Sequence, residues 1–269
     1  MTPAAISHQV KALEQHVGGL LFDRLTRALR LTDRGRAALP GLSEGFDLLA
    51  RAAETLTGGT ELDVLTLTTA PAFAAKWLVP RLDDFQSLNP DIKVRIDASI
   101  GVVDLGRDGV DVAIRYGRGN YRGHSAERLF EEEVFPVCSP KLMTGPHALN
   151  KPQNLAHHTL LHAGHAARDS SYPEWRMWLK SAGINNVDWR RGPEFSHENM
   201  AVQAALEGHG VALVNSSLVR DDLAAGGLVR PFELGIAMDF AYYLVIPDGN
   251  QDKPAIKAFR HWLLDIICS

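Results

Sequence analysis

Beyond residue 61 the sequence alternates short apolar runs with amphipathic segments, and this alternation restricts the fold more than any other feature. LDVLTLTT (62–69) and IKVRIDAS (92–99) are typical of strands, and PAFAAKWLVPRLDDFQSL (71–88) between them has the apolar spacing of a helix. Strands that alternate with helices favour a parallel sheet covered by helices. The pattern therefore predicts an α/β fold for most of the chain.

The alternation continues to the carboxyl terminus. Further strands are expected at 111–117, 132–139, 158–163, 210–215 and 241–247, and helices at 103–107, 173–183, 197–208, 217–225 and 254–268. With 269 residues, of which 45% are apolar and 22% charged, the chain can bury at least one full core. Two or three domains are expected.

The first 36 residues follow a different pattern. Ile6, Val10, Leu13 and Val17 recur at helical spacing, which predicts a short helix with one apolar face that ends at Gly18-Gly19. Five arginines then fall on a short hairpin-like segment: Arg24, Arg27, Arg30, Arg34 and Arg36. A helix followed by a basic hairpin is typical of a winged helix-turn-helix, which places the helix in the DNA major groove.

A seam of apolar residues follows the basic segment. Between Asp33 and Thr57 the steps alternate between three and four residues, as in a heptad repeat: Leu39, Leu42, Phe46, Leu49, Ala53 and Leu56. This spacing favours a helix that pairs with a second copy, and the alternative is a helix packed on its own domain. Gly58-Gly59-Thr60 then forms a linker.

Charge and motifs exclude several functional classes. A formal net charge of −4 argues against a protein that coats nucleic acid, although the amino end is locally basic. The two cysteines, Cys138 and Cys268, have no metal-binding spacing, and the histidines at 157–165 lie on a predicted strand without an acidic third ligand. No GxSxG, GxxxxGK[ST] or GxGxxG motif follows a strand. No catalytic residue, metal or cofactor is expected.

Three motifs near the amino terminus resemble a known family. AISHQVKALE (5–14), then LF-R-TR (21–27) and LT-RG (31–35), are similar to the recognition helix and wing of the LysR-type transcriptional regulators, at the family's spacing. FAAKWLVPRL (73–82) looks most like the branch that contains the glycine-cleavage activator and the β-lactamase-inducing regulators. The family places two helices before the recognition helix, so the resemblance implies that the first helices of the DNA-binding domain are missing from this sequence.

The resemblance implies an α/β fold with three parts. A truncated winged helix-turn-helix (1–36) and a linker or dimerisation helix (37–60) would precede a two-lobed effector region of the type II periplasmic-binding-protein kind (61–269). Lobe I would comprise 61–138 and 242–269, and lobe II would comprise 139–241. The crossovers are expected near 138–140 and 239–242.

The function implied is a DNA-binding transcriptional regulator controlled by a small effector, and not an enzyme. The implied partners are double-stranded DNA, provided that the native protein has the missing helices, a small-molecule effector, RNA polymerase, and further copies in a homodimer or homotetramer. No membrane partner and a cytoplasmic location are expected. The alternative is a small-molecule sensor or dimerisation module without autonomous DNA binding, and an upstream reading frame that encodes two helices would distinguish the two.

DNA contacts are expected at the helix and the wing. Pro3 and Ala4 lie at the predicted helix start, and Ser7 and His8 on its polar face are expected to meet bases or nearby phosphates. Phosphate contacts are expected from Lys11, Arg27 and Arg30.

Two strand-to-helix junctions are candidates for the effector site, because ligands of α/β sheets sit beyond the carboxyl ends of strands. Thr69 with Ala70 opens one predicted helix, and Ser196 with Asn199 opens the other. Each hydroxyl can simply cap its own helix. The family's effector cleft lies at matching positions, so the resemblance favours a binding role.

The remaining effector candidates follow other strands. They are Gly101, Val102, Arg115, Tyr116 and Tyr243. Arg115 can pair with an acidic effector, or it can bridge Asp104 or Asp111 within the lobe. Two helix amino termini that open near an arginine favour a small anionic effector of the carboxylate or amino-acid type.

Overall fold

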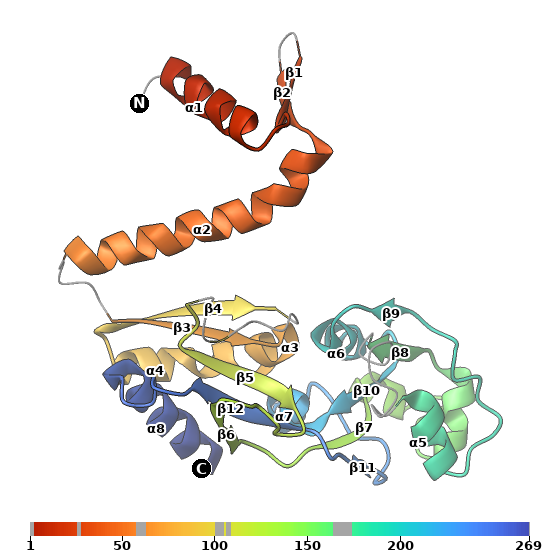
Figure 1. The fold of residues 1–269 in the computed structure, drawn as a ribbon. Helices are drawn as coiled ribbons and strands as arrows, with labels where there is room; N and C mark the ends of the chain where they lie inside the picture. The colour runs from red at the N-terminus through yellow and green to blue at the C-terminus, as the bar shows by residue number, and fades with distance from the viewer. Residues whose placement is uncertain are drawn as a thin grey trace. The chain divides into compact units, whose positions relative to one another are not determined.

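The computed structural model describes residues 3–25, 28–57, 63–99, 105, 109–163 and 174–268. The chain divides into two compact units, Met1–Glu61 and Leu62–Ser269. The first is drawn from red to orange and the second from yellow to blue in Figure 1. Among the described residues, no helix has both the length and the apolar character that a membrane span requires.

The first unit is a helix, a hairpin and a long helix. Helix α1 (Pro3–His16) is followed by strands β1 (Phe22–Leu25) and β2 (Ala28–Leu31), which pair antiparallel, and by α2 (Asp33–Thr57). The buried Glu14 carboxylate of α1 accepts the backbone N–H groups of Leu21 and Phe22 at 2.8 and 3.2 Å, and so fixes the hairpin to α1. The hairpin predicted for the wing is present.

Two glycines set the geometry of this unit. Gly18 has a φ of 67°, a left-handed conformation that ends α1. Gly35 lies in the first turn of α2, where a Cβ atom would come within 2.3 Å of the Leu21 carbonyl oxygen. Only glycine therefore allows α2 to start so close to the hairpin.

Lobe I of the second unit is built on a five-stranded sheet of order β4-β3-β5-β12-β6. Its strands are β3 (Asp63–Thr69), β4 (Ile92–Ala98), β5 (Val112–Gly117), β6 (His124–Arg128) and β12 (Ala241–Pro247). A continuous helical segment follows β3, namely α3 (Pro71–Phe73), η1 (Ala74–Leu78), η2 (Val79–Arg81) and α4 (Leu82–Leu88), and α8 (Pro254–Cys268) ends the chain. Phe73, Trp77, Phe85, Phe259 and Trp262 lie at the centre of the lobe I core.

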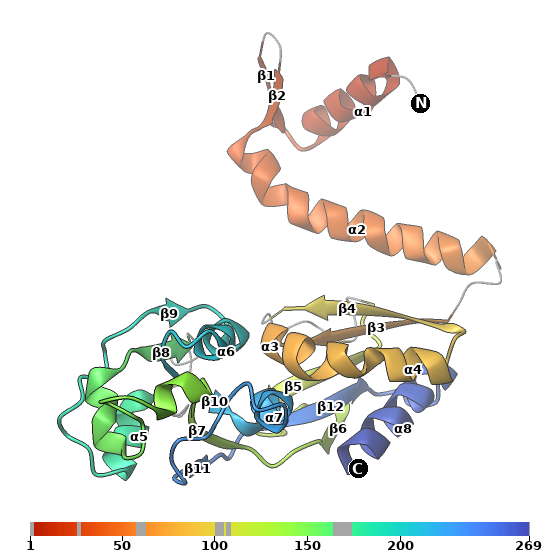
Figure 2. The same cartoon turned by 180° about the vertical axis from the view of Figure 1, so that it is seen from behind.

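Lobe II contains a second five-stranded sheet, of order β11-β7-β10-β8-β9. Its strands are β7 (Glu133–Cys138), β8 (Leu160–Ala163), β9 (Glu194–Phe195), β10 (Val211–Asn215) and β11 (Ile236–Ala237). Its helices are η3 (Pro140–Met143), η4 (Pro152–His157), α5 (Trp175–Ser181), α6 (Glu198–Leu206) and α7 (Ser216–Ala224). Separate cores cover the two faces of the sheet, and β10 is therefore buried along its whole length. Figure 2 shows the two lobes from behind.

Two expectations about the topology need correction. Lobe I was expected to extend to residue 138, but β7 pairs with β10 from Val134 to Cys138 and belongs to lobe II. The first crossover therefore lies between Arg128 and Glu133, whereas the second lies between Ala237 and Ala241, close to the expected position. The sheets are mixed rather than parallel, because β12 runs antiparallel to β5 and β6, and β7 runs antiparallel to β10.

Candidate functional site

Helix α7 joins the two lobes. Its Leu218 is part of the lobe I core and its Val219 is part of the core on one face of the lobe II sheet. Two ion pairs attach it to the helical segment after β3: Lys76 contacts Asp222 at 2.7 Å, and Arg81 donates to both carboxylate oxygens of Asp221 at 2.7 and 2.8 Å. These contacts fix α7 against lobe I.

A buried polar network lies where the carboxyl ends of β5 and β10 approach each other. The Tyr116 hydroxyl of lobe I donates to Asn215 Oδ1 of lobe II at 3.1 Å. The backbone N–H and side-chain amide of Asn215 donate to the carboxylate of Glu198, at 2.6 and 3.2 Å. Burial, with the charges of Glu198 and Glu132, raises the pKa of Tyr116 well above its usual range, so the phenol stays protonated as a donor.

A second buried carboxylate holds the start of α7. Glu132 Oε2 accepts the Ser216 hydroxyl at 2.7 Å and the backbone N–H of Ser217 at 3.2 Å. Burial raises the pKa of Glu132, and the hydrogen bonds from the two serines oppose that shift. Glu132 lies in the first crossover, so the crossover and α7 are tied together.

Thr69 is not the helix cap that the sequence predicted. The residue before α3 is Ala70, because Thr69 still pairs with Ala98 and Ile114 of the neighbouring strands. The Thr69 side chain is fully buried, and its hydroxyl has no hydrogen-bond partner within the described part of the chain. A buried hydroxyl without a partner is costly unless a ligand or water satisfies it.

Ser196 is not a cap either. The N-cap of α6 is His197, because the pairing of β9 with β8 keeps the chain extended up to the helix. Ser196 is exposed, and its hydroxyl lies 3.7 Å from the Met200 sulfur. Asn199 is half-buried, and its Oδ1 has no partner among the residues that the structure describes. Helices α3 and α6 are in contact, so the helices that follow the two predicted junctions are neighbours.

Arg115 and Tyr116 point to opposite faces of the lobe I sheet, as neighbours in a strand must. Tyr116 shares its face with Ile114 and Thr69, whereas Arg115 shares its face with Tyr243, its cross-strand partner. Tyr243 packs against Tyr121, with ring centroids 5.9 Å apart. Thr69 and Tyr116 therefore lie on one face of the sheet, and Arg115 and Tyr243 lie on the other, near the carboxyl ends of β3 and β5.

The Arg115 guanidinium has no carboxylate within ion-pair distance in the described ranges. It donates to Thr68 Oγ1 at 3.2 Å and to the Ser99 carbonyl at 3.5 Å, and burial lowers its pKa. The expected alternative of a bridge to Asp111 is wrong, since Asp111 pairs with Lys253 at 3.0 Å and accepts the Thr66 N–H at 2.9 Å. Asp104, Gly101 and Val102 lie outside the described residues.

Asn215 and Glu198 were missed by the sequence analysis. Asn215 ends the otherwise apolar run VALVN, and Glu198 stands in the first turn of a helix, yet it is only 1% exposed. For Asn215 the sequence did hold a signal, namely a polar residue at the end of a buried strand, because ligand sites of α/β sheets lie at strand ends. Nothing local to Glu198 indicates that it is buried.

Helix α1 is exposed on almost all of its described surface, including its apolar residues Ile6 and Leu13, so exposure does not single out the candidate DNA-contact residues. Ser7, His8 and Lys11 of α1 are exposed, and Pro3 and Ala4 lie in its first turn. Arg30 is exposed on β2 and lies 3.6 Å from Asp23 of β1, and Arg27 is outside the described residues. Arg34 has a structural role, because it donates to the carbonyls of Val17 and Gly18 at the end of α1.

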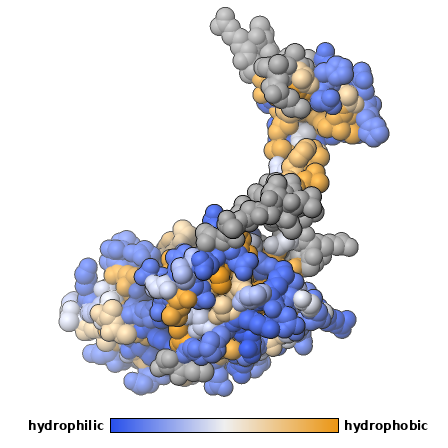
Figure 3. All heavy atoms as spheres, turned by 90° about the vertical axis from the view of Figure 1, so that its left-hand side faces the viewer, coloured by the Kyte–Doolittle hydropathy of each residue, from blue (hydrophilic) through white to orange (hydrophobic). Residues whose placement is uncertain are grey.

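The seam residues of α2 that the structure describes are exposed. Leu39 and Leu42 are 47% and 45% exposed, and Phe46 and Leu49 are 70% and 66% exposed. Figure 3 shows hydrophobic side chains on the surface of this unit. No described residue of the first unit buries these four side chains, as expected for a helix that pairs with another molecule.

Histidines near residue 160 are used in local contacts. His157 stacks on His147 with ring centroids 3.9 Å apart, and His158 Nε2 lies 2.7 Å from the His147 carbonyl oxygen. In the portion of the chain that is described, no group of three or more His, Cys, Asp or Glu residues is placed to hold a metal ion.

Comparison with protein-family models gives two matches. The LysR substrate binding domain matches residues 58–266, and the bacterial regulatory helix-turn-helix protein, lysR family, matches residues 1–36. Among curated proteins, the glycine cleavage system transcriptional activator of Escherichia coli K12 is 42% identical over 264 residues, which cover 98% of this chain and 85% of that protein. The HTH-type transcriptional activator AmpR of Pseudomonas aeruginosa is 36% identical over 267 residues, with 99% and 87% covered.

Solved structures show the same similarity. The effector domain of AmpR of Pseudomonas aeruginosa matches with a TM-score of 0.61 and 32% identity, over 77% of this chain and 96% of that one. CrgA, a LysR-type regulator from Neisseria meningitidis, matches with a TM-score of 0.60 over 100% of this chain and 91% of that one; at 22% identity it supports the fold alone. Both resemblances read from the sequence, to the family and to its branch, are confirmed. The chain belongs to the LysR family of transcriptional regulators and is not an enzyme.

Proposed function

We propose that a small anionic effector controls this regulator by binding where the carboxyl ends of β3 and β5 face lobe II. The observation that carries the proposal is the Arg115 guanidinium, which is half-buried and whose partners are a hydroxyl and a carbonyl rather than a carboxylate. The Asp97 carboxylate acts on Arg115 electrostatically, but it makes no ion pair with it, and a half-buried positive charge without a direct carboxylate partner favours an anionic ligand. The Thr69 hydroxyl and Asn199 Oδ1, which have no partner among the described residues, offer further hydrogen bonds, one from each lobe. Because Thr69 and Arg115 are on opposite faces of the sheet, a ligand that contacts both must lie beyond the carboxyl ends of the strands.

The same region connects the lobes, which supports a regulatory role. Tyr116 bonds to Asn215 across the lobe boundary, and it lies on the same strand as Arg115. A ligand that contacts both lobes stabilises the lobe arrangement to which it binds best. In this proposal the change passes through dimers formed by α2 to the DNA-binding unit, and from there to RNA polymerase.

A screen of small carboxylic acids by thermal shift tests the proposal. For a compound that stabilises the protein, Thr69→Val removes one hydroxyl and should weaken binding by about 0.5–1.5 kcal/mol. Thr66→Val is a matched control, because Thr66 lies three residues earlier on β3, away from the carboxyl end of the strand where the effector is proposed to bind. If the compound binds wild type, Thr69→Val and Ser196→Ala with equal affinity, the effector does not bind in this region.

DNA contacts are proposed for Ser7, His8 and Lys11 of α1 and for Arg27 and Arg30 of the wing. Arg30→Ala should weaken binding of the full-length protein to all DNA sequences alike and reduce the slope of log K against log salt by about 0.9, the value for one phosphate contact. Fluorescence anisotropy at several salt concentrations measures both. A changed operator preference with an unchanged salt slope would contradict the assignment of Arg30 to a phosphate.

A further inference from the structure

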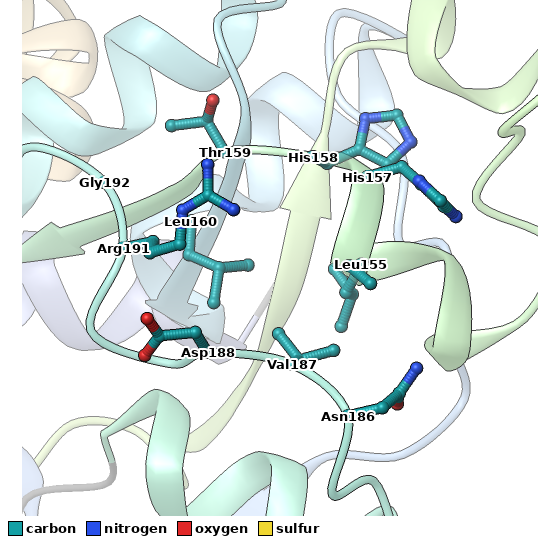
Figure 4. A pocket seen from close by; sticks show the side chains of 11 residues that line it. Leu155, His157, His158, Thr159, Leu160, Asn186, Val187, Asp188, Arg191 and Gly192 are labelled. Atoms are coloured by element: carbon teal, nitrogen blue, oxygen red, sulfur yellow. The ribbon is translucent and has the colours of Figure 1, made fainter.

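A pocket of about 400 Å³ opens on lobe II and contains none of the effector residues discussed above. It lies between η4 with the start of β8 on one side and the loop 186–192 on the other (Figure 4). Leu155, Leu160 and Val187 supply its apolar part, and the first two are buried. Its volume is that of pockets that bind small metabolites.

One guanidinium and one carboxylate line the pocket. Arg191 and Asp188 both line it and are exposed, and neither makes an ion pair within the described ranges. Asp188 Oδ1 accepts the backbone N–H of Arg190 at 3.2 Å, which leaves its other oxygen available. In Figure 4 the two side chains stand on one side of the pocket, and His157 and His158 stand on the other.

Both walls are held in place by contacts that do not involve the pocket charges. A Cβ atom on Gly192 would come within 1.8 Å of the Leu160 carbonyl oxygen, so the loop lies directly against β8. The backbone N–H of His162 in β8 donates to the carbonyl oxygen of Pro193, just after the loop, at 3.0 Å. On the opposite wall, His158 Nε2 carries its proton toward the His147 carbonyl, because a carbonyl oxygen can only accept. Arg191 and Asp188 therefore extend from a backbone that is already positioned.

We propose that this pocket binds a small zwitterion of the amino-acid class, with its carboxylate on Arg191 and its ammonium group on Asp188. A simple anion would be attracted by Arg191 but repelled by Asp188. A simple cation would be attracted by Asp188 but repelled by Arg191. A zwitterion satisfies both charges. The apolar residues then contact a small aliphatic side chain. The site gives lobe II a ligand input separate from the proposed effector region.

Isothermal titration calorimetry of the full chain tests this proposal with L-valine and with two analogues, each of which lacks one of its charged groups. Isovalerate keeps the carboxylate without the ammonium group, and isobutylamine keeps the amine without the carboxylate. L-Valine should bind, and each half should bind at least about tenfold more weakly. Equal affinity for isovalerate would show a plain anion site, and no L-valine binding at millimolar concentration would show no site; either result overturns the proposal.

Substitutions of the two charged residues test whether L-valine binds in this pocket. Arg191→Gln and Asp188→Asn should each weaken L-valine binding by about tenfold or more. Asp188→Asn retains the oxygen that accepts from Arg190, so the loop keeps its hydrogen bond. The matched control is Arg190→Gln, since Arg190 is an exposed neighbour that lies over the Trp189 ring at 4.5 Å and does not line the pocket. The assignment would be contradicted if Arg190→Gln lost as much L-valine affinity as Arg191→Gln. It would also be contradicted if Thr69→Val abolished L-valine binding while Arg191→Gln retained it.

Discussion

Arg115→Gln should weaken binding of an acidic effector by about 1.5–3 kcal/mol, which is a loss of roughly ten- to a hundredfold. The reason is that Arg115 is a half-buried cation whose direct hydrogen bonds go to Thr68 and Ser99, while the Asp97 carboxylate acts on it only from beyond ion-pair distance. Glutamine retains a donor but not the charge. Titration calorimetry with a compound found by the acid screen measures the loss directly.

The control for this substitution is Arg95→Gln. Arg95 is exposed on β4 of the same sheet, so the change removes the same charge from the protein without touching the proposed site. If both variants lose the same affinity, long-range electrostatics rather than a direct contact is responsible. If neither loses affinity, Arg115 does not contact the ligand.

The structure explains why the sequence predicted strands β3, β5 and β12 of lobe I but not strand β6. Strands β3, β5 and β12 are rich in apolar and β-branched residues and mostly buried, and their sequences showed this. Strand β6, with the sequence HSAER, lies at the sheet edge and is largely exposed. An edge strand needs little apolar pattern, because only one of its sides pairs with a neighbour.

The lobe boundary could not be read from local pattern. The segment of β7 was predicted correctly as a strand, but its lobe depends on pairing with β10, whose residues lie more than seventy positions later, as in Cys138 with Val211. Sequence periodicity reports which faces are apolar and not which strand is the neighbour. The error at residue 138 therefore concerns long-range topology.

The caps were wrong for a related reason. Thr69 and Ser196 each have the residue type of a cap, yet Thr69 continues β3, and Ser196 is one residue too early because β9 pairs with β8. Sheet pairing overrode the local preference. The outcome for Thr69 is a buried hydroxyl without a described partner, which is a stronger indication of a ligand than a satisfied cap.

Leu49→Glu should convert the protein to monomers at micromolar concentration. Leu49 is 66% exposed on α2, in line with Leu42 and Phe46, and an apolar stripe of this kind is buried when two copies pair. A glutamate there would place an unpaired charge in an apolar contact, at a cost of several kcal/mol for each copy. Light scattering measures the mass.

Ala37→Glu is the control for the same helix. At 3.6 residues per turn, Ala37 lies on the side of α2 away from Leu42 and Leu49, and it is exposed. This variant adds the same charge and should keep the mass of the wild-type protein. The measurement is made across a range of concentrations, so that a weakened association is distinguished from an abolished one. A Leu49→Glu protein that keeps a dimer mass throughout would show that a surface other than the α2 seam holds the subunits together.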